Sequence, residues 1–183
     1  MLPEWRRFVG WKILEHFLAH PSGEFYIKEL ARTLAVSPAS VHSYCGQYVN
    51  DGILRSEKKA NAKMMRLDND SPLARAIKRM YAMASLWEAG LATALGASPE
   101  AISFALYGSF ASGDYDDRSD ADIIAVSDKK IRREPFVKLQ ERLGRRVQLT
   151  ELSLAKWIAL KKEKDPFALS VLANNVVLRG AEL

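Results

Sequence analysis

Apolar residues in the first fifty positions recur at helical spacing and predict three short helices. Val9, Ile13 and Phe17 follow one another at intervals of four residues, which places them on one face of a helix. Residues 26–34 predict a second helix with an apolar inner face. Residues 38–50 predict a third, because Ser37 is a good N-cap and the following proline suits a first helical turn.

The pattern then changes from helical to strand-like. Asp51-Gly52 stops the third helix, and residues 53–55 and 64–67 are short apolar runs that predict two paired strands. Residues 58–61 would form the tip of this hairpin. The first 67 residues therefore form one predicted unit.

A long middle segment separates this unit from the rest of the chain. Turn formers cluster at residues 68–72 and again at 96–99, and the stretch between them predicts one helix from Pro72 to Leu95. Its apolar residues alternate in steps of four and three, as in a coiled-coil seam. They are Leu73, Ile77, Met80, Ala84, Trp87 and Leu91. Two interpretations stay open: the helix packs on its own domain, or it pairs with its mate in a homodimer.

The last part of the chain begins with a buried strand. Residues 102–107 form a mostly apolar run, and residues 119–126 form a second run that opens with carboxylates. A helix over 135–143 and a strand over 145–151 follow. We therefore divide the chain into residues 1–67, a linker helix over 68–95 and an α/β unit over 96–183.

Composition narrows the class of protein only a little. The 183 residues carry a net charge of +5, and residues 1–67 hold ten basic against six acidic side chains. This mild excess favours anionic partners weakly. No apolar run is long enough for a membrane span, and Cys45 is the only cysteine, so we expect a cytoplasmic protein without disulfides.

The candidate functional residues lie at and between the two predicted strands of the last unit. Gly108 allows a ligand to approach the backbone closely, and Ser109 lies where strand becomes helix, with free N–H groups suited to phosphate oxygens. Asp120 and Asp122 are two residues apart on the next strand and should face the same side. Two neighbouring carboxylates repel each other, and a Mg²⁺ ion would remove that cost.

This pattern resembles the DNA-polymerase-beta-type nucleotidyltransferase superfamily, in which Gly-Ser precedes Asp-x-Asp by about ten residues. The resemblance implies that Gly108 and Ser109 bind a nucleoside triphosphate, with ATP expected, and that Asp120 and Asp122 bind Mg²⁺ and are catalytic. The family's third carboxylate aligns with Gln148, which cannot act as a base. Glu151 is the candidate replacement, although in a regular strand it would point to the opposite face unless a bulge intervenes.

The N-terminal unit resembles a winged helix-turn-helix. The residues that carry the resemblance are Ile27-Lys28-Glu29-Leu30-Ala31, Val36-Ser37-Pro38-Ala39-Ser40-Val41 and Asp51-Gly52-Ile53-Leu54. The resemblance implies that the third helix enters the DNA major groove and that the wing contacts the backbone. That helix has no Lys or Arg, whereas residues 52–67 carry a net charge of +4, so phosphate contact is favoured over base readout. The candidate DNA-binding residues are Ser40, Ser43, Gln47, Arg55, Lys58, Lys59 and Lys63.

The sequence therefore predicts a two-domain α+β protein: an N-terminal winged helix, a linker helix, and a nucleotidyltransferase-type domain with a small mixed sheet. The leading hypothesis is Mg²⁺-dependent transfer of a nucleoside monophosphate to an acceptor hydroxyl on a small molecule, a nucleic-acid end or a protein. Small domains of this type act as antitoxins that modify a toxin, which makes a toxin-like partner one such acceptor. The alternative is a transcriptional regulator whose degenerate domain senses a nucleotide or only dimerises.

Overall fold

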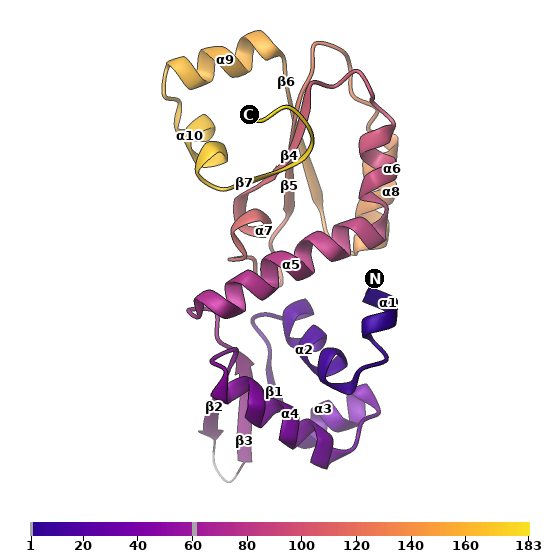
Figure 1. Ribbon diagram of the computed structural model, residues 1–183, viewed down its shortest axis with the longest axis vertical. Coiled ribbons are helices and arrows are strands. Elements are labelled where there is room, and N and C mark those ends of the chain that lie inside the picture. Colours follow the sequence, from indigo (N-terminus) through magenta and orange to yellow (C-terminus); the bar gives the residue numbers. More distant parts are fainter. Residues whose placement is uncertain (1, 60–61) are drawn as a thin grey trace. The chain divides into compact units, whose positions relative to one another are not determined.

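The computed structural model describes residues 2–59 and 62–183, and the chain forms two compact units (Figure 1). The first unit extends to Tyr81 and the second begins at Ala82. Residues 68–95, expected as a separate linker, are shared between the two units. Helix α5 (Pro72–Ala89) contributes to both.

The first unit combines helices with a small antiparallel sheet in the order β1-β3-β2. A buried core joins the helices to the strands, with Ile13, Phe17, Leu30 and Val41 fully enclosed. The helices are α1 (Leu2–Trp5), α2 (Val9–Ala19), α3 (Ile27–Leu34) and α4 (Pro38–Asn50), and the strands are β1 (Glu24–Tyr26), β2 (Leu54–Lys59) and β3 (Ala62–Leu67).

Helix α4 has the bounds that its sequence predicts. The Ser37 hydroxyl accepts a hydrogen bond from the Ser40 amide, which satisfies a free N–H of the first turn. Strand β1, in contrast, was not predicted. It lies where the sequence suggested the approach to the second helix, and its pairing with β3 sets Phe25 opposite Met65. The hairpin tip predicted at residues 58–61 is too long, because Lys58 and Lys59 belong to β2; residues 60–61 lie outside the described residues.

The prediction of one helix from Pro72 to Leu95 is wrong. Gly90 has a φ of +107° and separates α5 from α6 (Leu91–Gly96). Glycine reaches this conformation without the steric cost that other residues have. The apolar stripe also divides: Leu91 is buried, whereas Leu73, Met80 and Trp87 are 47%, 42% and 54% exposed.

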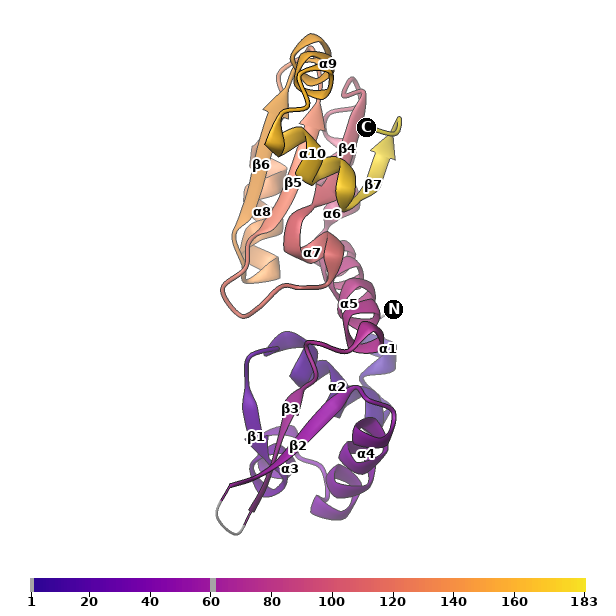
Figure 2. The same cartoon turned by 90° about the vertical axis from the view of Figure 1, so that its left-hand side faces the viewer.

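The second unit is built on a four-stranded mixed sheet in the order β6-β5-β4-β7. The β5–β6 pair is parallel and the other two pairs are antiparallel. Helices α9 and α10 cover one face of the sheet, and α6 and α8 cover the other (Figure 2). The strands are β4 (Ser103–Tyr107), β5 (Ala121–Val126), β6 (Val147–Leu152) and β7 (Asn175–Gly180). The helices not yet given are α7 (Gly108–Ser112), α8 (Glu134–Leu143), α9 (Leu154–Lys162) and α10 (Pro166–Ala173).

The central strands β4 and β5 are almost fully buried because both faces of the sheet are covered. Tyr107 and Ile124 face Trp157 on one side, and Phe104 packs against Phe136 on the other. The sequence prediction of a small mixed sheet with helices is confirmed. This arrangement brings the end of β4 and the start of β5 to the same edge of the domain.

Arg179 fastens the edge strand β7 to the segment that precedes β4. Its guanidinium donates hydrogen bonds of 2.7 Å to the carbonyl oxygens of Leu95 and Ser98. The same group lies over the ring of Phe104, 5.2 Å from its centroid. One side chain therefore donates both to the last turn of α6 and to the turn that follows it, where the Ser98 carbonyl also accepts from the Ala101 amide.

Across residues 2–59 and 62–183, every helix is too short or too polar to cross a membrane.

Candidate functional site

The end of β4 and the start of β5 meet at a single glycine. Tyr107 lies opposite Asp122 in the ladder, and the chain turns at Gly108 with a φ of +70° to begin α7. A Cβ atom at this position would lie 2.7 Å from Oδ2 of Asp122. Gly108 is therefore required both for the backbone conformation and for the space that the Asp122 carboxylate occupies.

Asp120 and Asp122 differ in how firmly the fold holds them. Asp122 is the second residue of β5, whereas Asp120 immediately precedes the strand. Burial raises the pKa of Asp122, and the negative charge of Asp120 raises it further. The Arg146 guanidinium opposes this shift, with its Nη1 atom 3.7 Å from Oδ2 of Asp120. The two carboxylates are thus close enough to repel each other.

The loop between α7 and Asp120 is held by an extensive set of hydrogen bonds. The carbonyl oxygen of Ser109 accepts from the amides of Gly113 and Asp114 at 2.9 and 3.0 Å. The carboxylate of Asp116 accepts from the Ser119 hydroxyl at 2.8 Å, a contact that lowers the pKa of Asp116. From the other side of the loop, Arg145 donates to the carbonyl oxygen of Asp116 at 2.7 Å. The loop therefore has a defined conformation beside the carboxylate pair.

Glu151 does not join the carboxylate pair. The β5–β6 register is regular from Ala121↔Val147 to Val126↔Leu152, so Gln148 lies opposite Asp122 and Glu151 lies three residues further along. No bulge returns Glu151 to the face of Asp122. Its carboxylate instead accepts from Arg133, which precedes α8 on the other face of the sheet, at 2.7 Å. The neutral amide of Gln148 therefore occupies the position where the resemblance expects a third acid.

The residues at this edge fit a magnesium ion as far as donor type is concerned. Asp120 and Asp122 supply carboxylate oxygens, and Mg²⁺ is commonly held by one or two carboxylates together with substrate phosphates and water. Within residues 2–59 and 62–183, no three or more His, Cys, Asp or Glu side chains gather as a metal cluster. An ion at this edge would complete its shell with other oxygen atoms, such as those of water and of a bound phosphate.

Arg146 is the residue at this edge that the sequence analysis missed. The sequence shows it two positions before Gln148, where strand alternation places both on the face of Asp122. Its partner, however, depends on pairing between β5 and β6, which the sequence alone does not reveal.

In the first unit, the candidate DNA-binding residues of α4 are not equally available. Ser43 and Gln47 are exposed. Ser40 is half-buried, and its hydroxyl accepts a hydrogen bond of 2.9 Å from Ser37 at the start of the helix. Helix α3 adds two exposed cations that the sequence analysis did not select, Lys28 and Arg32.

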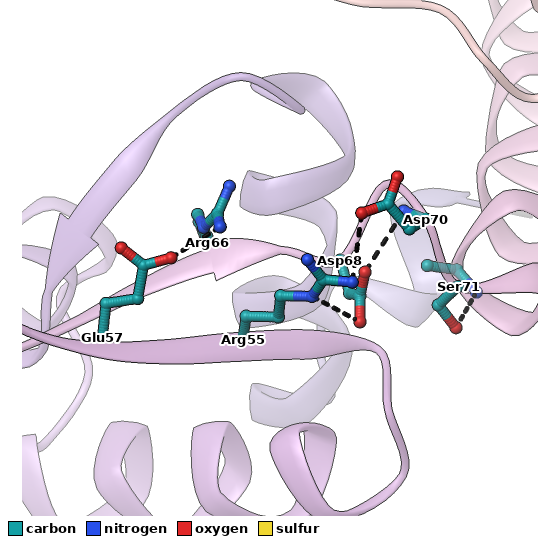
Figure 3. A network of polar contacts seen from close by, with 7 residues as sticks. Arg55, Glu57, Arg66, Asp68, Asp70 and Ser71 are labelled. Atoms are coloured by element: carbon teal, nitrogen blue, oxygen red, sulfur yellow. Dashed lines mark hydrogen bonds and ion pairs between the residues drawn. The ribbon is translucent and has the colours of Figure 1, made fainter.

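The arginines of the β2–β3 hairpin are already paired with carboxylates (Figure 3). Arg55 contacts Asp68 at 2.9 Å and Asp70 at 3.1 Å, and Arg66 contacts Glu57. Asp68 and Asp70 lie just beyond the segment whose net charge suggested phosphate contact. Arg55 is thus held at the base of the hairpin, and its charge is compensated there.

Two lysines of the hairpin lie in a different setting. Lys58 and Lys63 are both exposed and lie directly opposite each other in the β2–β3 ladder. Like charges in facing positions are destabilising, so an anion bound between them would relieve the repulsion. The side chain of Lys59 lies outside the described residues.

The second unit matches a known protein family. Residues 91–181 match the family model described as polymerase beta, nucleotidyltransferase. The match begins at the first residue of α6 and continues just beyond β7, so it includes the whole four-stranded sheet and its carboxylate pair. It supports a nucleotidyltransferase domain in the second unit and does not extend to the first. No curated protein and no solved structure matches the chain.

Proposed function

We propose that the second unit transfers a nucleoside monophosphate from a nucleoside triphosphate, ATP being the first to test, to an acceptor hydroxyl. The observation that carries this proposal is the packing of the Asp122 carboxylate against Gly108, beside Asp120, within a domain that matches the nucleotidyltransferase model. The resemblance to the nucleotidyltransferase family indicates the class of reaction, and the geometry supports the roles that we propose for the residues.

Each residue has a distinct role in this proposal. Asp120 and Asp122 hold Mg²⁺, which when bound neutralises phosphate charge and aligns an in-line displacement. Gly108 and Ser109 approach the triphosphate through the backbone of the turn. In the reaction a bond forms between the acceptor oxygen and the α-phosphorus. The bond from that phosphorus to the bridging oxygen breaks, pyrophosphate leaves, and the acceptor proton passes to solvent.

We expect slow turnover, because the side chain of Gln148 is neutral. No carboxylate lies there to take the acceptor proton, because Glu151 is on the other face with Arg133. Gln148→Asp would place a third acid opposite Asp122. We expect this variant to raise product formation above wild type by about 100-fold, the lower end of the range of general-base effects.

Binding and transfer are tested separately. ATP is titrated calorimetrically into wild type and Asp122→Asn, with Mg²⁺ and with EDTA, and Asp117→Asn controls for the loss of one loop charge. Binding of ATP that requires both Mg²⁺ and Asp122 supports the proposed metal–nucleotide site. If none of the four nucleoside triphosphates binds under any of these conditions, the site is rejected. Labelled ATP then distinguishes the chain itself, a small hydroxyl compound, a nucleic-acid end and a toxin-like protein as acceptor.

We propose as a second candidate that the first unit is a winged helix that binds DNA, and that the protein acts as a transcriptional regulator. The facing pair Lys58 and Lys63 favours this proposal, since a backbone phosphate would separate their charges. Ser43 and Gln47 of α4 are the exposed groups for the bases. In this case the second unit senses a nucleotide or serves only for dimerisation.

Salt dependence tests the DNA proposal. Lys58→Ala with Lys63→Ala should weaken binding to all duplexes alike and reduce the slope of log K against log salt by about two. Lys138→Ala, in the second unit and paired there with Glu134, removes one charge as a control. A double variant with the slope of wild type contradicts phosphate contact by this hairpin.

The homodimer is proposed through α5, because Leu73, Met80 and Trp87 recur every seven residues and are all exposed. Light scattering of wild type and Met80→Lys tests it. A monomeric wild type at high concentration rejects this partner.

A further inference from the structure

The backbone of Arg146 is hydrogen-bonded to the start of β5, and its side chain is exposed. Its carbonyl oxygen accepts a hydrogen bond of 2.9 Å from the amide of Ala121, the residue between Asp120 and Asp122. Its side chain is 70% exposed and forms an ion pair with the Asp120 carboxylate at 3.7 Å. The fold therefore keeps this guanidinium beside the carboxylate pair without locking it in place.

The side chain of the neighbouring Arg145, in contrast, is held by several contacts. It donates to the carbonyl oxygens of Asp116 and Ser119 at 2.7 and 3.4 Å, and it lies over the rings of Phe110 and Tyr115. These contacts commit Arg145 to holding the loop. An exposed ion pair with a separation near 4 Å, such as that of Arg146, contributes little to stability and is easily exchanged for another.

A cation at Asp120 would change the surroundings of Arg146. The ion and the guanidinium would compete for the same carboxylate oxygen, and their like charges would repel each other. A triphosphate on that ion brings phosphate oxygens to the same edge of the sheet, because phosphates complete the shell of a carboxylate-bound Mg²⁺. A guanidinium binds phosphate through two parallel hydrogen bonds, which an ammonium group cannot do.

We propose that Arg146 exchanges partners when substrate binds: it pairs with Asp120 in the free protein and binds a phosphate of the metal–nucleotide complex. This inference rests on the proposed nucleotidyltransferase function and adds a phosphate-binding residue to it. Arg146 thereby opposes binding of the metal alone and favours binding of the metal together with nucleotide. Free divalent ions are held weakly, and the complete substrate is selected.

The proposal predicts two effects of opposite sign for Arg146→Met. Affinity for Mn²⁺ alone should rise by about twofold to fivefold, since the competing ion pair is lost. Affinity for ATP at saturating Mg²⁺ should fall by about tenfold or more, since a charge-assisted pair of hydrogen bonds is lost. Paramagnetic resonance of free Mn²⁺ measures the first and calorimetry the second. Both are binding measurements and need no acceptor.

Two further variants separate contact from general charge. Arg142→Met removes an exposed arginine near the end of α8, where its guanidinium lies beside Gly90, and should leave both affinities as in wild type. Arg146→Lys retains the charge and loses the fork, so Mn²⁺ affinity should stay near wild type while ATP affinity falls. If Arg146→Lys binds ATP as tightly as wild type does, the effect of Arg146 on ATP affinity is due to charge alone. That result overturns the proposed contact between the guanidinium and a phosphate.

The remaining outcomes are equally decisive. Circular dichroism first establishes that each variant is folded, which is expected because only the backbone of Arg146 joins the β5–β6 ladder. Wild type that binds neither Mn²⁺ nor ATP overturns the proposed function itself. Wild type that binds both, with Arg146→Met indistinguishable from it, overturns only the exchange of partners.

Discussion

Gly108→Ala is the substitution whose effect the structure specifies most closely, because two separate costs meet at one Cβ atom. The residue has a φ of +70°, and the added carbon would lie 2.7 Å from Oδ2 of Asp122. The left-handed conformation costs a non-glycine residue about 1–2 kcal/mol. Displacing the Asp122 side chain from its rotamer adds roughly 0.5–1.5 kcal/mol.

Gly144→Ala separates these two costs. Gly144 has a φ of +69° in the same unit, and a Cβ atom there meets nothing within 4 Å. This control should lose only the conformational part, about 1–2 kcal/mol, and Gly108→Ala should lose about 2–3 kcal/mol in total. Urea unfolding followed by circular dichroism measures both free energies of unfolding.

Binding distinguishes the two glycines more sharply than stability does. Gly108→Ala moves the carboxylate that we propose as a metal ligand, so Mg²⁺-dependent ATP binding should fall by about tenfold or more. Gly144→Ala should bind as wild type does. Equal stability losses and equal binding in the two variants would refute the inference that Gly108 makes room for Asp122.

Three further predictions concern other parts of the fold. Arg179→Met should destabilise the second unit by about 1–3 kcal/mol, because it removes the donor to the Leu95 carbonyl and one of two donors to the Ser98 carbonyl, which keeps the Ala101 amide; urea unfolding measures this, and an unchanged midpoint refutes it. Burial lowers the pKa of His16 below 6.5, so the folded first unit disfavours the proton. Its stability should be complete above pH 6.5 and decline as the pH falls below that value, and His16→Gln should flatten this dependence in melts taken at several pH values. Burial raises the pKa of Cys45 to about 11, so thiol labelling at pH 8 should be slow in the native protein and fast in urea; rapid native labelling would contradict the burial.

Features fixed by neighbouring residues could be predicted from the sequence. Helix α4 begins after Ser37 and ends before Asp51, because a cap, a proline and a stop signal all lie within the segment itself. The sequence also predicted that β4 ends just before Gly108 and that the two carboxylates lie at the start of the next strand. The strand alternation also gave the direction of Glu151 correctly.

Features fixed by distant residues could not be predicted. Strand β1 has only three residues and exists through its pairing with β3, some forty positions later. The net charge of +4 was counted over residues 52–67, whereas the carboxylates that pair with Arg55 belong to Asp68 and Asp70. The charge count therefore could not show that Arg55 is paired. The apolar stripe continued through Gly90, because hydrophobic spacing does not register a change of backbone direction.

Asp120 and Asp122 differ in the backbone entropy that each has left to lose when a ligand binds, because one lies at the end of a loop and the other in a strand. Asp122 is held in the β5 ladder and has little backbone freedom left to lose. Asp120 stands at the end of a loop whose conformation Arg145 holds through two carbonyl groups. The backbone order of Asp120 therefore depends on the contacts of the loop and not on the ladder. Arg145 thus controls how much of the order around Asp120 is complete before a ligand arrives.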